Sequence, residues 1–297
     1  MYLYHYGLRE LPFTITPNTQ FYYDLKSHHE AFEVVLTALK TGEGFIKITG
    51  EVGTGKTLLC RRLLNDIPYF FKTAYIPDSY LDPAIAQELS VETEQLTNQQ
   101  QLARALQQRL LDVNKSGQAV VILIDEAQAL PEESLEALRL LSNLETERRK
   151  LVHIILLGQP ELDERLSQKA FRQLRQRISF AHKLTAMNVD ETAEYIAHRM
   201  DVAGYKGAPI FDWKLIKGLH RSSRGVPRLV NMLCHKMLLL AYGEGRRQLS
   251  SKDLKLAVKD TEDTELTRSV WLPVTVSVGF VFLAAAAVSY WKMGGSL

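Results

Sequence analysis

Cysteine is scarce in this chain of 297 residues, which contains two, Cys60 and Cys234. Two cysteines so far apart in the sequence cannot form a disulfide framework, and they do not have the spacing of a metal site. Each lies within an apolar helical pattern. We therefore expect buried, reduced thiols in a reducing compartment.

An excess of charge of one sign is also missing, because 36 Lys and Arg face 34 Asp and Glu, for a formal net charge of +2. This near-neutral balance argues against nucleic acid as an obligate partner, although charge can still gather in patches. Residues 1–10 lack a basic segment followed by an apolar run. No signal peptide is therefore expected at this end.

Near the C-terminus, charged residues are absent from Ser269 to Trp291. As a helix, residues 271–291 would span roughly 31 Å, close to the hydrocarbon thickness of a bilayer. Trp271 and Trp291 lie at its ends, where aromatic rings anchor in the interface, and Pro273 falls in the first turn, where a helix tolerates proline. A buried helix of a globular domain is the alternative, but the segment is apolar all round, which favours a transmembrane helix.

Between residues 45 and 184, short β-rich runs alternate with helical patterns. This alternation predicts an α/β fold, in which helices cover both faces of a parallel sheet. The run 119–125 is almost wholly apolar until its last residue, as a strand buried on both sides requires. The expected strands are 45–49, 73–76, 119–125, 152–157 and 179–182, and the helical stretches between them include 58–64, 101–114 and 133–148.

After about residue 186 the β-rich runs stop, and helices are expected at 190–203, 212–220, 227–242 and 251–259. Ser250 or Ser251 can cap the last of these, with Asp253 in its first turn. The sequence thus predicts an α/β domain at 1–185, a small all-helical domain at 186–262, a linker at 263–270 and a membrane helix at 271–291.

The segment after the first expected strand reads Gly50-Glu51-Val52-Gly53-Thr54-Gly55-Lys56-Thr57 and matches G-x-x-x-x-G-K-[ST]. In this pattern glycines let backbone N–H groups cradle phosphate oxygens, the lysine reaches the β- and γ-phosphates, and the hydroxyl of Thr57 ligates Mg²⁺. The following helix, which opens near Leu58, points its positive end at the anion. A glycine-rich turn with a surface lysine is the alternative, but a strand directly before and a helix directly after favour an ATP or ADP site.

Two carboxylates follow the central expected strand, Asp125 and Glu126. An Asp at the carboxyl end of a buried strand lies beside the phosphate loop, where it can hold Mg²⁺, partly through water. The adjacent Glu126 is the natural base to polarise an attacking water. We therefore expect Thr57 and Asp125 at the metal and Glu126 at the hydrolytic water.

With these residues the chain resembles the AAA+ ATPases, and among them the ExeA/GspA family of membrane-anchored secretion and pilus ATPases. The resemblance rests on the opening Tyr6-Gly7-Leu8-Arg9-Glu10-Leu11-Pro12-Phe13, the phosphate loop, Leu123-Ile124-Asp125-Glu126-Ala127-Gln128-Ala129-Leu130 and Gly158-Gln159-Pro160-Glu161-Leu162. It implies that the helical domain is a lid, that residues 1–40 form an adenine-side segment of the nucleotide-binding domain, and that adenine packs near Phe13 and residues 25–32.

The resemblance also implies roles for polar residues outside the loop. Gln159 would be the sensor that positions water near the γ-phosphate, and Arg228 would be the sensor arginine of the lid. Arg177, or alternatively Arg175, would be an arginine finger that acts on the site of a neighbouring subunit. A finger of this kind requires a homo-oligomer and contributes a factor of about 10³ to 10⁵ in rate.

The resemblance further implies a single-pass protein of the bacterial inner membrane, with the ATPase in the cytoplasm, that drives assembly of a pilus or secretion machine through inner-membrane partners. The basic residues nearest the expected membrane helix agree with this orientation: Lys252, Lys255, Lys259 and Arg268 precede it, and Lys292 follows. The family carries a further, periplasmic domain, whereas only residues 292–297 follow here. Two alternatives are a nucleic-acid-binding adaptor ATPase of the transposition type and a switch that binds ATP and seldom hydrolyses it.

Overall fold

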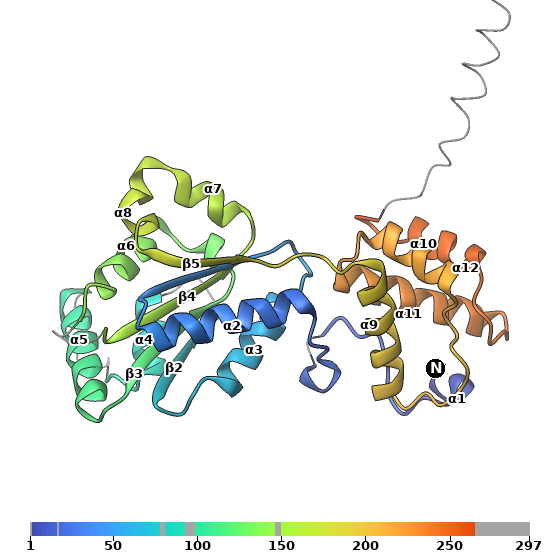
Figure 1. Cartoon of the computed structure of the whole chain (residues 1–297), viewed down its shortest axis with the longest axis horizontal. Helices are drawn as coiled ribbons and strands as arrows, with labels where there is room; N and C mark the ends of the chain where they lie inside the picture. Colours follow the sequence, from blue (N-terminus) through green and yellow to red (C-terminus); the bar gives the residue numbers. More distant parts are fainter. Residues whose placement is uncertain (1, 17, 78–80, 93–98, 146–149, 265–297) are drawn as a thin grey trace, which may run out of the picture.

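A computed structural model of the chain describes residues 2–16, 18–77, 81–92, 99–145 and 150–264. The described residues form an α/β domain and a helical domain that lie side by side (Figure 1). The chain passes from the first to the second after strand β5.

The α/β domain is built on a five-stranded parallel sheet with the order β2-β3-β4-β1-β5. The predicted parallel sheet is therefore confirmed, although β2 and β5 are each longer than their expected runs. The strands are β1 (Phe45–Thr49), β2 (Phe71–Ile76), β3 (Ala119–Ile124), β4 (Val152–Gly158) and β5 (Ile178–Lys183).

Both faces of the sheet are covered by helices. Along β3, the side chains of Val121 and Leu123 pack on one face, and those of Ile122 and Ile124 pack on the other, and all are fully buried. Helices α2 (Lys26–Thr41) and α3 (Lys56–Asp66) cover the first face. The second face is covered by α4 (Leu81–Glu88), α5 (Gln99–Lys115), α6 (Glu132–Leu141), α7 (Glu161–Ser167) and α8 (Arg172–Arg175).

The helix expected at 133–148 ends earlier, because α6 stops at Leu141. The next residue, Ser142, turns its hydroxyl back to the carbonyl of Arg139 at 2.7 Å, which competes with the helical hydrogen-bond pattern. A short antiparallel bridge between Glu145 and Lys150 then leads into β4.

The helical domain consists of α9 (Val189–Val202), α10 (Trp213–Ser223), α11 (Pro227–Gly243) and α12 (Ser251–Lys259), in the places expected from the sequence. Local chemistry defines where each begins. Asn188 and Ser250 form capping boxes with Glu191 and Asp253, and Pro227 opens α11. The predicted cap at Ser250 is thus confirmed.

The N-terminal segment before α2 packs in the helical domain, which corrects the expected assignment of residues 1–40 for residues 2–16 and 18–25, whereas residues 26–40 lie on the sheet as expected. Its apolar side chains enter the core between α9, α10 and α11, and only α2 packs against the sheet. The segment contains α1 (Leu3–Tyr6) and the 3₁₀ helix η1 (Thr19–Phe21), too short to bury their own aromatic rings. The buried members are Tyr2, Tyr6, Leu8, Phe13, Phe21 and Leu25.

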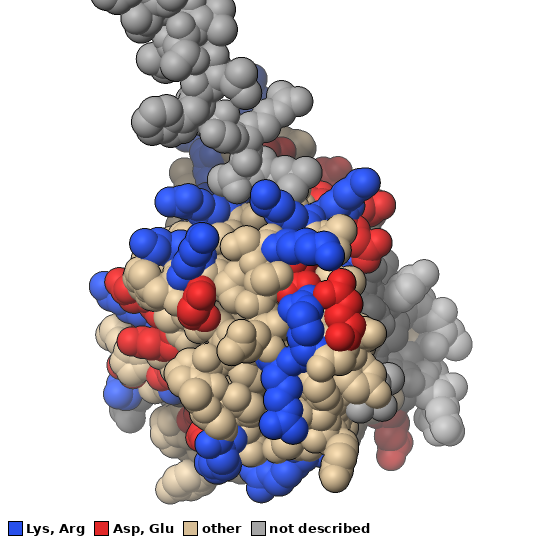
Figure 2. All heavy atoms as spheres, turned by 90° about the vertical axis from the view of Figure 1, so that its right-hand side faces the viewer, with Lys and Arg blue, Asp and Glu red and all other residues tan. Residues whose placement is uncertain are grey.

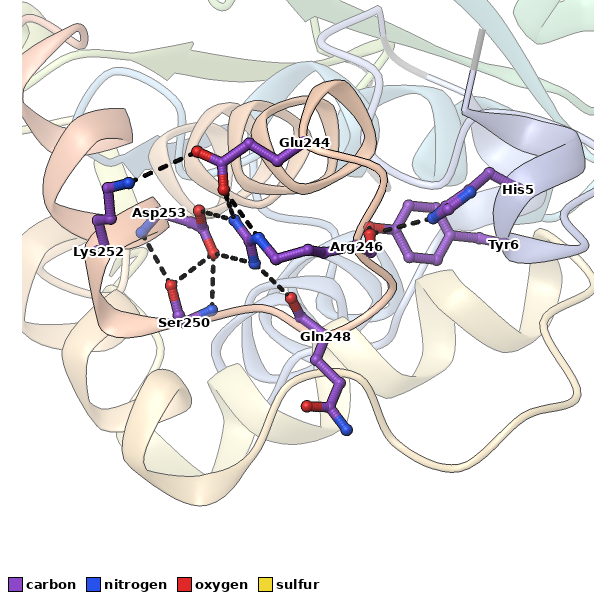
Figure 3. Close-up of polar contacts among 8 residues, drawn as sticks. All are labelled: His5, Tyr6, Glu244, Arg246, Gln248, Ser250, Lys252 and Asp253. Atoms are coloured by element: carbon purple, nitrogen blue, oxygen red, sulfur yellow. Dashed lines mark hydrogen bonds and ion pairs between the residues drawn. The ribbon is translucent and has the colours of Figure 1, made fainter.

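A polar cluster around Arg246 connects α1 to the start of α12 within the helical domain (Figure 3). Its guanidinium donates to Asp253 at 2.7 Å and to Glu244 at 2.8 Å. The carbonyl of Arg246 accepts a hydrogen bond from His5 at 3.0 Å, so the cluster reaches α1. Burial raises the pKa of Asp253, but the hydrogen bonds and charge of Arg246 together with Ser250 outweigh it and hold the pKa below its ordinary value.

Among the residues that the structure describes, none of the helices is both long and apolar enough to cross a bilayer. The membrane helix expected at 271–291 and most of the linker expected at 263–270 lie outside the described residues.

We predict that Arg246→Met lowers the melting temperature of the helical domain by several degrees, because the side chain of Asp253, which is 1% exposed, keeps its charge without its cation. Thermal unfolding followed by circular dichroism measures the loss. It should disappear as the pH falls through the lowered pKa of Asp253, since the protonated carboxyl no longer needs Arg246. Arg247→Met, at the exposed neighbouring position, is the control. Equal melting temperatures for the two variants would contradict the prediction.

Candidate nucleotide site

The phosphate loop lies between β1 and α3 and is shaped by its glycines. Gly53 and Gly55 have φ values of +81° and +97°, a region that favours glycine. At Gly50 a Cβ atom would lie 2.8 Å from the hydroxyl of Thr54 and 2.9 Å from Leu184. The backbone therefore takes a tight turn that side chains at these positions would prevent.

Lys56 is the first residue of α3 and is buried within the loop. Its ammonium donates to the carbonyls of Gly50 at 2.8 Å and Glu51 at 3.2 Å. Burial lowers the pKa of Lys56, and the charges of Glu126 and Asp125 oppose this shift. The cation is thus held at the centre of the loop, where a phosphate group of ATP or ADP would meet it.

The hydroxyl of Thr57 donates to a carboxylate oxygen of Asp125 at 2.8 Å, across the gap between α3 and β3. Burial raises the pKa of Asp125, and the hydrogen bonds from Thr57 and from the backbone of Glu126 act against this rise. A hydroxyl and a carboxylate side by side are the hard oxygen donors that Mg²⁺ prefers. The residues present therefore fit the expected ion.

Glu126 follows β3 with a φ of +49°, an uncommon backbone conformation for a residue other than glycine. Its carboxylate accepts hydrogen bonds from the side-chain amides of Gln128 and of Gln159, the latter at 3.0 Å. Burial raises the pKa of Glu126, but these bonds and Lys56 outweigh it, so the net shift is downward. The carboxylate is ionised at neutral pH and held in one orientation beside the loop.

Gln128 is a residue to which the sequence assigned no role, although it stands in the run that follows β3. It donates to Glu126, and its amide oxygen accepts the backbone N–H of Gln159 at 3.0 Å. It thereby links the ends of β3 and β4. Its position two residues after Glu126 was the available signal in the sequence, but a glutamine in a loop does not by itself indicate a function.

A cavity of about 210 Å³ opens beside the loop and is bounded by both domains. From the α/β domain come residues of the loop, Glu126 and Gln159. From the helical domain comes Arg228, whose backbone N–H donates to the carbonyl of Gly53 at 3.3 Å. The structure thus brings together Val52, Gly53, Gly55, Lys56, Thr57, Leu58, Glu126, Gln159 and Arg228 around one cavity.

Phe13, which the resemblance placed near adenine, instead packs edge-on against Phe211 in the helical core with a ring-centroid distance of 5.8 Å. Leu25 is buried in the same core, and neither residue lines the cavity. The N-terminal segment still reaches the cavity through Thr14, Ile15, Thr16 and Asn18.

Three residues of the helical domain that the sequence did not single out, Tyr195, Arg199 and Asn231, also line the cavity. Arg199 is buried and forms no ion pair within the described part of the chain. It donates to the carbonyl of Pro12 at 2.6 Å and to the hydroxyl of Tyr195 at 2.9 Å, and Tyr195 donates to Asn231 at 3.1 Å. This network ties the N-terminal segment to α9 and α11 at the wall of the cavity.

His28 in α2 contacts the phosphate loop and supports its backbone. Its Nε2 lies 2.7 Å from the carbonyl of Thr54, so Nε2 carries the proton, and its Nδ1 has no hydrogen-bond partner among the described residues. Burial lowers the pKa of His28, which favours this neutral form. A Cβ at Gly55 would lie 2.7 Å from the imidazole ring, so the glycine permits the contact.

The two candidate finger arginines do not line the cavity of their own chain. Arg177 is partly buried and donates to the hydroxyl of Ser142 at 2.9 Å. Arg175, at the end of α8, is exposed, with one long contact of 3.4 Å to the carbonyl of Ser167. Of the two, Arg175 is the freer to extend toward another molecule.

We predict that His28→Phe weakens ATP affinity roughly tenfold, because the carbonyl of Thr54 loses its buried donor and the loop loses its support. Isothermal titration with Mg-ATP measures the change. His29→Phe is the matched control, since His29 is exposed on the same helix and pairs with Asp24. Unchanged affinity in a folded His28→Phe variant would show that the bond does not support binding.

Comparisons with known proteins agree with this geometry. Residues 39–166 match the family model described as AAA domain. General secretion pathway protein A of Aeromonas hydrophila is 38% identical over 262 residues, which cover 86% of this chain and 48% of that protein. The chain therefore spans about half the length of the curated relative that it matches.

Solved structures share the fold at low identity. ORC2 of Aeropyrum pernix, in ADPNP–ADP complexes, has a TM-score of 0.62 at 15% identity and covers 85% of this chain and 73% of its own. Cdc6p of Pyrobaculum aerophilum has a TM-score of 0.63 at 14% identity, with coverages of 82% and 71%. Together with the phosphate loop and the paired acids, these matches mean that the chain contains an AAA domain and is an ATP-hydrolysing P-loop enzyme.

Proposed function

We propose that this chain is a membrane-anchored ATPase that hydrolyses ATP in a self-associated state and drives assembly of a type IV-like pilus, of the MSHA type, or of a secretion machine. The observation that carries the ATPase part is the bond from Gln159 to Glu126 beside the phosphate loop. This contact joins a candidate base and a candidate water-positioning group at the place where the terminal phosphate would lie.

Hydrolysis would use the residues of the cavity in distinct roles. Glu126 accepts a proton from the attacking water, and Gln159 orients that water. Lys56 and the backbone N–H groups of the loop stabilise charge on the phosphates. Thr57 and Asp125 would hold Mg²⁺, and the ion would neutralise phosphate charge when bound.

The helical domain would act as a lid that responds to the nucleotide. It approaches the loop closely at Gly53, where an added Cβ would lie 2.6 Å from the Cβ of Arg228. The exposed side chain of Arg228 lines the cavity and can reach toward the γ-phosphate. Loss of that phosphate would remove the attraction and change the angle of the lid.

The site would be completed by an arginine from a neighbouring subunit. Among the described residues, the arginines near β5 do not line the cavity of their own chain, which supports a finger that acts on another copy. Arg175 and Arg177 are the candidates, and the greater exposure of Arg175 supports its choice. Such a shared site makes turnover depend on self-association.

The cellular role is proposed from the relative whose name refers to general secretion and from the resemblance to the pilus biogenesis protein MshM. In this proposal, residues 271–291 anchor the chain once through a bacterial inner membrane, with the AAA domain in the cytoplasm. The partners are inner-membrane components of the pilus or secretion machine, and nucleic acid is not obligate.

We predict that Glu126→Gln binds Mg-ATP with nearly unchanged affinity but loses turnover by a factor of about 10² to 10⁴, because the amide cannot accept the proton. Titration calorimetry and phosphate release separate the two effects. Glu133→Gln, at an exposed acid of α6, is the control. If Glu126→Gln assembled pili or supported secretion as well as the unaltered chain, ATP would act only as a structural ligand.

We predict that Arg175→Ala and Glu126→Gln are each nearly inactive alone but regain partial ATPase activity when mixed. In a mixed oligomer, a subunit with intact Glu126 can receive Arg175 from its neighbour. Phosphate release is measured as the total protein concentration is raised. The experiment is repeated with Arg177→Ala in place of Arg175→Ala, to determine which arginine acts as the finger. Two results would contradict the shared site. The first is a specific activity of the unaltered chain that does not change with protein concentration. The second is that neither Arg175→Ala nor Arg177→Ala restores activity when mixed with Glu126→Gln.

A further inference from the structure

A groove between α10 and α12 stands apart from the nucleotide site, on the helical domain. Its volume is about 580 Å³. Four exposed cations line it, Lys214, Lys217 and Arg221 from α10 and Lys255 from α12. None of the described residues that line this basic groove is acidic, and none of the four cations forms an ion pair within the described part of the chain.

The spacing of these cations follows from helix geometry. Lys214, Lys217 and Arg221 stand at positions i, i+3 and i+7 of α10 and so share one face. Lys255 belongs to a stripe of the same spacing on α12, with Lys252 and Lys259. The two helices approach closely, since a Cβ at Gly218 would lie 2.6 Å from Leu254, and Lys255 is the member of the α12 stripe that lines the groove opposite α10. Figure 2, which looks onto the helical end of the molecule, shows basic side chains gathered over the upper part of this face.

Trp213 lies at the edge of the basic groove and is 47% exposed. The ammonium of Lys217 lies 5.7 Å from the centre of its ring. An exposed Trp beside Lys and Arg is the combination found at the interface of a bilayer, where the ring enters the headgroup region and the cations meet phosphates.

The last described residues place the groove close to where the chain leaves the helical domain. The hydroxyl of Thr264 donates to the carbonyl of Val258 at 3.0 Å, and Val258 lines the groove. Residue 271, where the uncharged apolar stretch begins, follows seven residues later, which an extended chain spans in about 24 Å at most. A membrane anchor there would hold the groove near the bilayer surface.

From the charge of the groove, the exposed ring and this short connection, we propose that the α10–α12 face docks on anionic phospholipid headgroups. The inference rests on the proposed anchoring of the chain and deepens it. Each Lys or Arg near an anionic leaflet strengthens binding roughly fivefold, so the four cations favour the docked orientation by several hundredfold. Docking would fix the helical domain on the membrane and leave the α/β domain to move relative to it.

The test uses the full chain with Trp271→Phe and Trp291→Phe, so that Trp213 is the single remaining tryptophan. The protein is reconstituted in vesicles of phosphatidylcholine, with or without phosphatidylglycerol. We expect phosphatidylglycerol to shift the emission of Trp213 to the blue and to protect it from acrylamide, and high salt to reverse both effects. Replacing Lys214, Lys217, Arg221 and Lys255 by Gln should abolish the protection.

The matched control replaces four exposed lysines of the α/β domain by Gln, Lys26, Lys40, Lys115 and Lys169, and should keep the protection. The high-salt experiment uses the unaltered groove and so does not depend on the folding of the variant with four Gln substitutions. Equal quenching of Trp213 with and without phosphatidylglycerol overturns the proposal. So does duplex DNA that protects Trp213 in phosphatidylcholine vesicles as well as the anionic lipid does, because the occupant would then be nucleic acid.

Flotation of the unaltered chain with vesicles of phosphatidylcholine alone reports on anchoring, which does not need the groove. If the chain floats with these vesicles but the emission and quenching of Trp213 do not depend on phosphatidylglycerol, the anchor is present and the docking proposal is wrong. A chain that fails to float, yet protects Trp213 when phosphatidylglycerol is added, supports the docking face and refutes the anchor.

Discussion

The position of β1 in the sheet is the constraint on which the nucleotide site depends. In the order β2-β3-β4-β1-β5, the carboxyl ends of β1, β4 and β3 are neighbours. The phosphate loop follows the first, Gln159 the second, and Asp125 with Glu126 the third. The backbone N–H of Gly50 donates to the carbonyl of Gly158 at 3.1 Å, and Thr57 bonds to Asp125 at 2.8 Å, so the three ends are held together by direct contacts. Parallel pairing fixes the edge of the sheet where these strands end, so the residues of the site are positioned mainly by the strand order.

Much of this domain was predictable from the sequence, because its signals are local. Apolar runs predicted the parallel strands, and the glycines and Lys56 predicted the loop between β1 and α3. The contacts that escaped prediction join residues far apart in the chain. His28 supports Thr54 across 26 positions, and Arg199 reaches Pro12 across 187. A lone histidine or arginine in a helix has no periodic signature, so its partner becomes known only when the tertiary structure does.

The N-terminal segment shows a different limit of sequence reasoning. Its aromatic residues read as part of the domain that follows them in the chain, whereas they fill the core of the helical domain. A short helix such as α1 cannot bury its own rings, and the nearest large apolar surface decides where it packs. Arg199 of α9 then binds this segment, so the wall of the cavity depends on residues that lie far apart in the chain.

This arrangement means that the polypeptide crosses between the two domains twice, once near Leu25 and again after β5. The crossings run next to each other, because the backbone N–H of Thr185 donates to the hydroxyl of Ser27 at 2.9 Å. A paired connection of this kind resists torsion more than a single tether does. In the proposed lid movement, the helical domain would therefore bend about this paired connection, and the contact between Gly53 and Arg228 would open or close.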